Sequence, residues 1–216
     1  MKLVVIGGGE HARVVLEAAR SRPDLWDITG FVDVNPNPET ERRLGVLRLG
    51  GDVEGRNLSA GGSVQFVLGL AGLGAQGARM ALVKTYDEAG AHWATIVHAN
   101  AWVSPTAHLS EGVFVSAGAV VNTGARVERH AVINTSAVVE HDVVVEAFAH
   151  LAPGAVIGGG ARIGSHAYVG LGARVRDHVA IGEGATIGMG AVVVGPVPPN
   201  VVVIGNPAKA QGSLRR

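Results

Sequence analysis

The chain has 216 residues and a formal net charge of zero, from 18 basic and 18 acidic side chains, so its charge favours neither a nucleic acid nor an anionic membrane as partner. It has no cysteine, which excludes disulfides, thiolate metal ligands and a cysteine nucleophile. No apolar run reaches the ~18 residues of a membrane span, and the apolar stretch at the start is too short for a signal peptide, so we expect a cytoplasmic protein.

Residues 1–95 alternate between strand-like and helix-like patterns. The apolar run Leu3–Ile6 predicts a buried strand, and apolar residues at positions 12, 15, 16 and 19 predict a helix after it. The alternation predicts a small Rossmann-like parallel sheet. The other predicted elements are a strand at Ile28–Val32, a loop at Asn35–Glu41, a strand at Val64–Leu68 and a helix over 76–88.

A glycine-rich segment, GGGEHA at 7–12, joins the first predicted strand to the first predicted helix. It matches the pattern G-x-G-x-x-A, which alone is a weak motif. Backbone amides at a helix N-terminus favour a phosphate group, so a dinucleotide and a nucleotide sugar are both candidate ligands. The alternative is a tight turn that binds nothing.

A repeat of six residues dominates the rest of the chain. From Val97 onward an aliphatic residue recurs at every sixth position, through 17 repeats over residues 97–198 without insertion or deletion. Alanine or valine stands four positions after each of them, and glycine is abundant at 32 of 216 residues. A period of six fits neither an α-helix nor a flat strand. It predicts short strands joined by corners, with three repeats in each triangular coil.

Residues three repeats apart are therefore expected to lie directly above one another on one side of a prism. Such a prism has almost no interior for a ligand, so we expect its binding sites on the outside, against a neighbouring molecule. The repeat resembles the left-handed parallel β-helix of hexapeptide-repeat acyltransferases, and the left hand is implied by this resemblance alone. These relatives form trimers, which implies a homotrimer with sites at the subunit interfaces.

Several motifs extend the resemblance over almost the whole chain. They are GGGEHARVV at the front, GVLRLGGDVE, ATIVHANAWVSPTA, NTSAVVEHD at 134–142 and the tail motif GNPAK. The chain resembles sugar acyltransferases of the sialic acid O-acetyltransferase (NeuD/PglD) type. The resemblance implies a Rossmann-like nucleotide-sugar-binding domain (1–95), a left-handed β-helix with the acyl-CoA and catalytic residues (96–198), and a C-terminal tail (199–216).

The resemblance also implies a reaction. Acetyl-CoA would donate an acetyl group to the amino group of a UDP- or dTDP-linked 4-amino-deoxy sugar, with transfer to a sugar hydroxyl or to sialic acid as the alternative, and without a metal. His141 matches the family's general base, and histidine suits this role because its unperturbed pKa of ~6.5 lies near working pH. Asp142 matches the acidic residue that orients this base and raises its basicity.

The other site residues are implied in the same way. Acetyl-CoA would be contacted by His150, by the amide of Gly159 at the thioester carbonyl, and by the backbone at Leu171 and Met189. The nucleotide sugar would be contacted by Gly8, Gly9 and His11 at the diphosphate, by Asp33 near the base, and by Gly69 and Asn134 near the sugar. Relatives often carry a glycine-asparagine pair where this chain has Gly69-Leu70, so a contact at Gly69 would lack its asparagine.

Two hypotheses from other functional classes stay open. A carbonic-anhydrase-like metalloenzyme would need three ligands converging on zinc at ~2.0–2.1 Å, and the chain has no compact histidine pair at five-residue spacing to favour it. A non-catalytic scaffold that binds a nucleotide sugar would have no use for the His141-Asp142 pair. The remaining prism histidines 130, 166 and 178 are predicted to be solvated surface residues.

Overall fold

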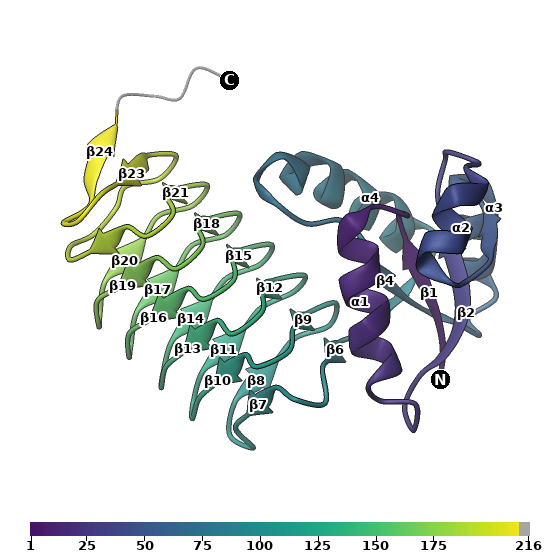
Figure 1. The fold of residues 1–216 in the computed structure, drawn as a ribbon, viewed down its shortest axis with the longest axis horizontal. Helices are drawn as coiled ribbons and strands as arrows, with labels where there is room; N and C mark the ends of the chain where they lie inside the picture. Colours follow the sequence, from purple (N-terminus) through teal and green to yellow (C-terminus); the bar gives the residue numbers. More distant parts are fainter. Residues whose placement is uncertain (212–216) are drawn as a thin grey trace. The chain divides into compact units, whose positions relative to one another are not determined.

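The computed structural model describes residues 1–211, which fall into two compact units, Met1–Ala99 and the part from Asn100 onward (Figure 1). The first unit is an α/β domain, and the second is a prism of short parallel strands. Within residues 1–211, no helix has both the length and the apolar character needed to cross a membrane.

The first unit is built on a five-stranded parallel sheet. Its strands are β1 (Lys2–Ile6), β2 (Asp27–Val32), β3 (Arg48–Gly50), β4 (Gln65–Leu68) and β5 (His92–Trp93). Its helices are α1 (Glu10–Arg20), α2 (Pro38–Leu44), α3 (Asp52–Ala60) and α4 (Gln76–Glu88), with a 3₁₀ turn, η1, at Leu73–Ala75. The predicted Rossmann-like alternation is confirmed.

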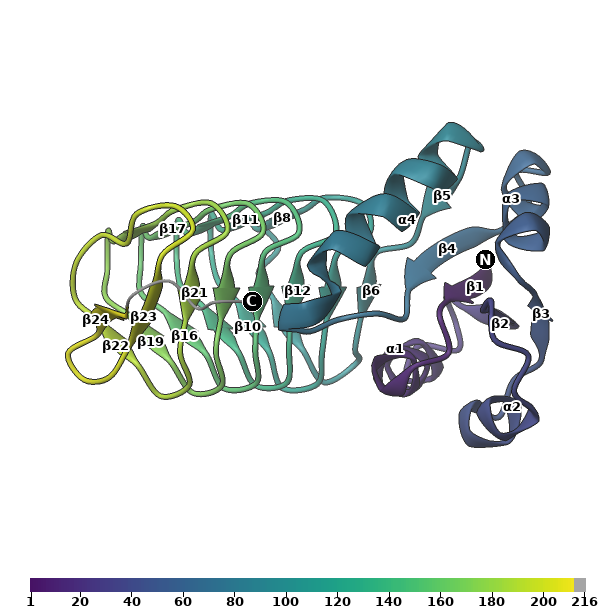
Figure 2. The ribbon, with the colours of Figure 1, turned by 90° about the horizontal axis from the view of Figure 1, so that it is seen from above.

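The strand order is β3-β2-β1-β4-β5, with α1 and α2 on one face of the sheet and α3 and α4 on the other (Figure 2). The chain moves outward from β1 to β3 and then places β4 on the opposite side of β1. The order of the strands therefore reverses between β1 and β4. In open sheets of this kind, ligands bind beyond the carboxyl ends of the strands near the reversal.

The loop predicted over Asn35–Glu41 is wrong in its second half, because α2 begins at Pro38. The side chain of Asn37 accepts a hydrogen bond from the amide of Glu39 at 2.9 Å and so caps the helix. Proline at the first helical position costs nothing, since the amide it lacks has no helical partner there. The residues that suggested a loop are the start signal of a helix. The short β3 and α3 have no counterpart among the predicted elements.

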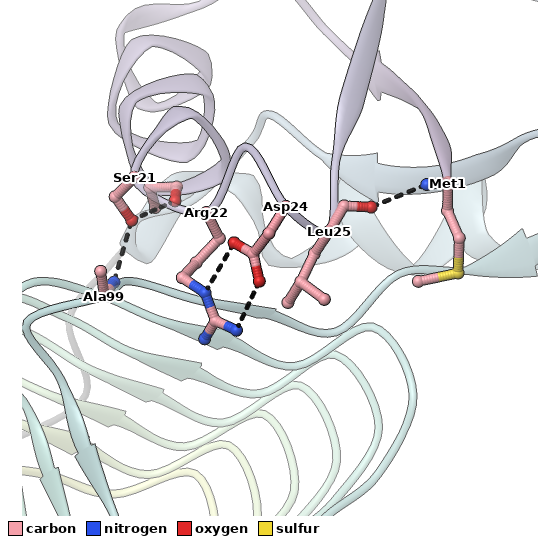
Figure 3. A network of polar contacts seen from close by, with 7 residues as sticks. Met1, Ser21, Arg22, Asp24, Leu25 and Ala99 are labelled. Atoms are coloured by element: carbon pink, nitrogen blue, oxygen red, sulfur yellow. Dashed lines mark hydrogen bonds and ion pairs between the residues drawn. The ribbon is translucent and has the colours of Figure 1, made fainter.

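A small network of hydrogen bonds lies at the C-terminal end of α1 (Figure 3). The hydroxyl of Ser21 donates to the carbonyl of Ala18 at 2.6 Å and accepts from the amide of Ala99 at 2.9 Å. It thereby ties the last residue of the first unit to this helix. The strand β6 (Ile96–Val97), just before Ala99, also contacts α1.

The second unit is a triangular prism with a strand at every sixth residue. Face 1 contains β7 (Trp102–Val103), β10 (Val120–Val121), β13 (Val138–Val139), β16 (Val156–Ile157), β19 (Arg174–Val175) and β22 (Val192–Val193). Face 2 contains β8 (His108–Leu109), β11 (Arg126–Val127), β14 (Val144–Val145), β17 (Arg162–Ile163) and β20 (Ala180–Ile181). Face 3 contains β9 (Phe114–Val115), β12 (Val132–Ile133), β15 (His150–Leu151), β18 (Tyr168–Val169), β21 (Thr186–Ile187), β23 (Val202–Ile204) and β24 (Lys209–Gln211).

Strands three repeats apart pair in parallel without any shift, as Val138 with Val156 and Val156 with Arg174. From Val115 onward, the aliphatic residues of the repeat point inward and are almost completely buried, as Ile133, Leu151 and Ile157 show with 0% exposure. The alanine or valine residues at the small position of the repeat are also buried from Val113 onward. The predicted left-handed parallel β-helix is confirmed, and its core is one narrow column of aliphatic side chains.

The corners of the prism require a backbone that most residues avoid. Corner residues have φ near +60°, a value that glycine adopts freely and that Asn, Asp and His tolerate better than bulky side chains. His130 is one of these corner residues, and the prediction that it is a solvated surface residue is wrong. Its ring is 1% exposed and stacks on Phe148 with centroids 5.1 Å apart, and Phe148 stacks on His166 at 5.3 Å. His178 is exposed, as predicted.

The chain continues beyond the last complete coil. β23 adds to face 3 in parallel with β21, and β24 pairs with β23 in the antiparallel sense. Of the tail segment 210–216, Ala210 and Gln211 belong to β24. The rest of that segment, residues 212–216, lies outside the described residues.

Candidate active site

The edge between faces 1 and 2 presents His141 and Asp142 side by side. Both side chains are exposed, and Nδ1 of His141 lies 3.0 Å from Oδ2 of Asp142. A carboxylate can only accept here, so Nδ1 carries the proton. The other ring nitrogen, Nε2, is then left with its lone pair, which a general base needs. Asp142 has φ +58°, the left-handed backbone of a corner residue.

Gly159 lies one coil further along, directly beside this ring. A Cβ atom at Gly159 would stand 2.4 Å from Nε2 of His141, so only glycine leaves the ring where it is. The amide of Gly159 has no hydrogen-bond partner within residues 1–211. A free amide beside a basic nitrogen is the arrangement that stabilises a developing oxyanion next to the site of proton transfer. The structure thus brings together His141, Asp142 and Gly159.

Acidic groups around this edge raise the pKa of His141 above its ordinary value. The hydrogen bond to Asp142 contributes most, the negative charges of Asp142, Glu140 and Asp177 add to it, and partial desolvation opposes it. Asp177 stands 36 residues after His141, two coils along the same edge. A higher pKa makes the neutral imidazole a stronger base.

His150 lies on face 3, which is the face opposite the edge that carries His141. Its ring is 3% exposed and meets Tyr168 edge to face, with centroids 5.1 Å apart. Nε2 of His150 is 3.4 Å from Nδ2 of Asn134, whose own oxygen accepts from the amide of Thr135 at 2.8 Å. The structure therefore places the predicted residues His150 and Asn134 together, but away from His141 of the same chain.

Leu171 and Met189 lie on the edge between faces 3 and 1. The carbonyl of Leu171 accepts from the amide of Gly190 at 2.8 Å, which fixes these two coils against each other. Both side chains are exposed, Leu171 at 46% and Met189 at 75%. In one chain, the residues predicted to bind acetyl-CoA thus occupy three different sides of the prism.

The glycine loop of the first unit is hydrogen-bonded to side chains from other segments of that unit. The amide of Gly8 donates to Oδ2 of Asp33 at 2.6 Å, and its carbonyl accepts from Nη2 of Arg43 at 2.6 Å. A Cβ at Gly8 would lie 2.6 Å from Cγ2 of Thr40. Among the described residues, no side chain caps α1 at Gly9, so the helix start offers amides to an anion.

His11 stands in the first turn of α1 and is neutral at pH 7. Burial, followed by the positive charge of Arg79, lowers the pKa of His11 to about 4. Arg79 on α4 is 1% exposed, and burial lowers the pKa of its guanidinium to about 10, which leaves it charged. The sequence analysis missed this buried cation, because an arginine among alanines in a helix carries no motif.

A cavity of about 510 Å³ opens beyond the carboxyl ends of β1 and β2. It is lined by Gly7, Asp33 and Leu70 and by one face of α4. Asp33 is held by its second oxygen as well, since Oδ1 accepts from the amide of Asn35 at 2.8 Å. The volume lies within the range of small-molecule sites, ≈ 300–1,000 Å³.

Close packing around position 69 explains why this residue is a glycine. A Cβ there would lie 2.6 Å from the carbonyl oxygen of Gly7 and 2.8 Å from Cγ1 of Val5, so no side chain fits between β4 and the glycine loop. The amide of Gly69 donates to the carbonyl of Ile6 at 2.7 Å. Its neighbour Leu70 is the residue that lines the cavity.

Comparison with known proteins identifies the family. Residues 2–86 match the family model of the PglD N-terminal domain, and residues 136–171 match that of the bacterial transferase hexapeptide (six repeats). A histidine-to-asparagine mutant of perosamine N-acetyltransferase from Caulobacter crescentus, solved with CoA and GDP-perosamine, is 35% identical, with a TM-score of 0.90 over 98% of this chain and 97% of that one. The chain belongs to the NeuD/PglD-like family of hexapeptide sugar acyltransferases.

Two further structures resemble this acyltransferase. The acetyltransferase domain of PglB from Neisseria gonorrhoeae FA1090, in complex with acetyl coenzyme A, is 32% identical, with a TM-score of 0.87 over 97% of this chain and 98% of that one. WeeI from Acinetobacter baumannii AYE, at 23% identity and a TM-score of 0.81 over 98% of this chain and 100% of that one, shares the fold. The comparison with curated protein sequences returned no match.

The acyltransferase shows no clustered metal ligands in residues 1–211, where no three His, Asp or Glu side chains come close enough to hold an ion together. The edge that carries His141 also contains a residue that the sequence analysis missed. Asp177 shares the edge with His141, and its spacing of twice the coil length is the signal that could have revealed it.

Replacement of Asp142 by asparagine tests the electrostatics of this acyltransferase. Asparagine tolerates the positive φ and can still accept a hydrogen bond from Nδ1, so the change removes mainly the charge. Because Asp142 raises the pKa of His141, its loss lowers that pKa. The acid limb of a plot of kcat/KM against pH is expected to move to lower pH, while the maximal rate falls because the neutral partner stabilises the imidazolium less.

Asp177→Asn provides a comparison for Asp142→Asn, with a smaller expected shift of the acid limb. Asp177 acts on His141 through its charge alone, without the hydrogen bond that makes Asp142 the largest contributor. Its removal is expected to shift the acid limb in the same direction by a smaller amount. An acid limb that stays in place in Asp142→Asn would show that it does not report on His141.

Proposed function

We propose that the chain transfers the acetyl group of acetyl-CoA to the amino group of a nucleotide-linked 4-amino-deoxy sugar, with His141 as the general base. The observation that carries this proposal is the position of Nε2 of His141, with Nδ1 held by Asp142 at 3.0 Å and the Gly159 amide beside the ring. The complexes of the Caulobacter and Neisseria relatives with CoA, GDP-perosamine and acetyl coenzyme A support it. Since acetyl-CoA is an intracellular metabolite, the proposal places the reaction in the cytoplasm.

The chemistry asks little more of the protein. The neutral amine of the sugar attacks the thioester carbon while Nε2 of His141 takes the proton that the nitrogen loses. The carbonyl oxygen becomes negative, and the Gly159 amide is placed to donate to it. The C–S bond then breaks, CoA leaves as a thiol after receiving a proton, and the sugar keeps an amide. Asp142 stabilises the imidazolium that exists between the two proton transfers.

A homotrimer is part of the proposal, and the prism geometry supports it. His141 lies on one edge, whereas His150 lies on the opposite face and Leu171 and Met189 on another edge. A single acetyl-CoA cannot touch all of these positions on one narrow prism. It can do so where the His141 edge of one copy meets face 3 of the next, and three such contacts close a ring.

The test is release of free CoA, measured with a thiol reagent, across a panel of acceptors. The panel holds 4-amino sugars linked to UDP, dTDP and GDP, together with free sialic acid. Release with one of the amino sugars, accompanied by a mass gain of one acetyl group on that sugar, supports the proposal. Release with sialic acid alone would replace it by O-acetylation. Binding of acetyl-CoA without release to any acceptor would favour the scaffold hypothesis.

A further inference from the structure

The cavity of the first unit has a wall against which a planar aromatic ring can pack. Four residues at helical spacing on α4, namely Ala78, Ala81, Leu82 and Thr85, form one wall. Two of them are alanines, and the hydroxyl of Thr85 donates to the carbonyl of Ala81 at 2.9 Å and is therefore already engaged within the helix. This wall is therefore apolar and shallow, which suits the face of a nucleobase. The inference that follows rests on the proposed function, in which the first unit binds a nucleotide sugar.

The polar groups of the cavity are divided between its two ends. Gly7 lines the cavity after β1, where its amide donates to the carbonyl of Val32 at 2.8 Å, and α1 begins just beyond it with an N-terminus that no side chain caps within the described residues. Asp52 lines the cavity from the start of α3, just after β3, and its carboxylate has no hydrogen-bond or ion-pair partner within residues 1–211. β1 and β3 are two places apart in the sheet, so these ends are separated by roughly 10 Å, twice the ≈ 4.8 Å strand spacing.

This separation sets the direction of a bound nucleotide. A diphosphate is repelled by the Asp52 carboxylate and attracted by the amides at the helix start, so it belongs at the Gly7 end. The ribose then bridges the middle, and the base reaches Asp52. Asp33, between the two ends, already accepts backbone hydrogen bonds at both oxygens, from Gly8 and Asn35. Asp52 is therefore the carboxylate that is available to the base.

A free carboxylate selects among the bases by the donors they present. Guanine offers two neighbouring donors, N1–H and the 2-amino group, which match two carboxylate oxygens in a bidentate pair. Uracil and thymine offer one N–H between two carbonyl oxygens, so the second carboxylate oxygen would face a like partial charge. Adenine offers its amino group next to a ring acceptor. The side chain of Asn35, which also lines the cavity, has an amide donor suited to guanine O6.

We propose that Asp52 makes this site specific for a guanosine diphosphate sugar. The resemblance of the sequence by itself favours UDP or dTDP, whereas the chemistry of the cavity favours GDP. The Caulobacter relative solved with GDP-perosamine shows that the family includes an enzyme with such a ligand.

The experiment measures the Kd of the full chain for GDP, IDP, UDP and dTDP by calorimetry, without acetyl-CoA. IDP is the sharpest probe because it differs from GDP only by the missing 2-amino group. GDP is expected to bind about 10- to 100-fold more tightly than UDP or dTDP, the usual discrimination of one bidentate base contact, with IDP in between. In Asp52→Asn the side chain presents one donor and one acceptor, so the affinity for GDP is expected to fall to that for UDP.

Glu54→Ala is the matched control. Glu54 accepts from the amide of Gly51 at 2.8 Å and so stabilises the start of α3 without lining the cavity. This variant is expected to keep the preference for GDP. Equal binding of all four nucleotides, an unchanged preference in Asp52→Asn, or the same loss in Glu54→Ala would each overturn the inference. Selective GDP binding in a protein that never acetylates a GDP-linked amino sugar would contradict the proposed reaction and leave this specificity standing.

Discussion

Replacing His141 by alanine is expected to lower kcat by ~10²–10⁴, the usual contribution of a general base. The loss arises because the change removes the imidazole nitrogen that lies beside Gly159 and takes the proton of the amine. The affinity for acetyl-CoA is expected to stay near that of the unchanged protein, since the side chain acts on the acceptor nitrogen and not on the CoA. Stopped assays of CoA release and a separate binding titration measure the two effects independently.

His108→Ala is the matched control for this prediction. His108 is also an exposed histidine on the prism, but it belongs to face 2 and has no acidic neighbour of the Asp142 kind. Its removal is expected to leave kcat unchanged. If His141→Ala kept more than about a tenth of the original kcat, a loss below the ~10² lower bound for a general base, the assignment of His141 as the base would be wrong.

Gly159→Ala is expected to lower kcat by about 10²-fold while the fold persists, because a misplacement of about 1 Å at a catalytic group has an effect of this size. The added methyl group would occupy a point 2.4 Å from Nε2 of His141. The ring is the free end of a flexible side chain, so it swings away and the backbone stays in place. The amide of residue 159 survives the change, which separates displacement of the base from loss of an oxyanion donor.

Gly195→Ala provides the control on the same edge. Gly195 lies two coils beyond Gly159, and a Cβ there would meet no atom within 4 Å. Neither glycine has the positive φ that penalises alanine. Equal kcat values for the two variants would contradict the role of Gly159. Circular dichroism and thermal melting of both proteins establish that any loss of activity is not a loss of folding.

The sequence predicted the prism so fully because each repeat is specified by its own six residues. The inward aliphatic residue, the small residue and the corner glycine recur locally, and the column that unites His141 with Gly159 follows by counting three repeats. Counting also places His150 half a coil from His141, nine residues later in an 18-residue coil, and the structure has it on the face opposite the His141 edge.

The first unit was less predictable because its site is assembled from distant segments. The cavity takes residues from the ends of β1 and β2, from the start of α3 and from α4, and no spacing in the sequence relates them. Asp52 belongs to a helix that was not predicted at all. The stack of His130 on Phe148 was missed for a different reason, since outward corner residues can cover one another along the prism.

The unshifted pairing of strands from successive coils makes the prism work like a screw thread. Removing one repeat between His141 and Gly159 would leave every strand with a partner but would advance all later residues by one side. His141 would then face a residue from a different edge, and the proposed catalytic column of His141 and Gly159 would be broken in an otherwise intact protein. Removing or adding one whole coil beyond the site would change only the length of the thread. The protein can therefore vary in length by whole turns, and the turn is the smallest unit by which evolution or design can alter it without dismantling the active site.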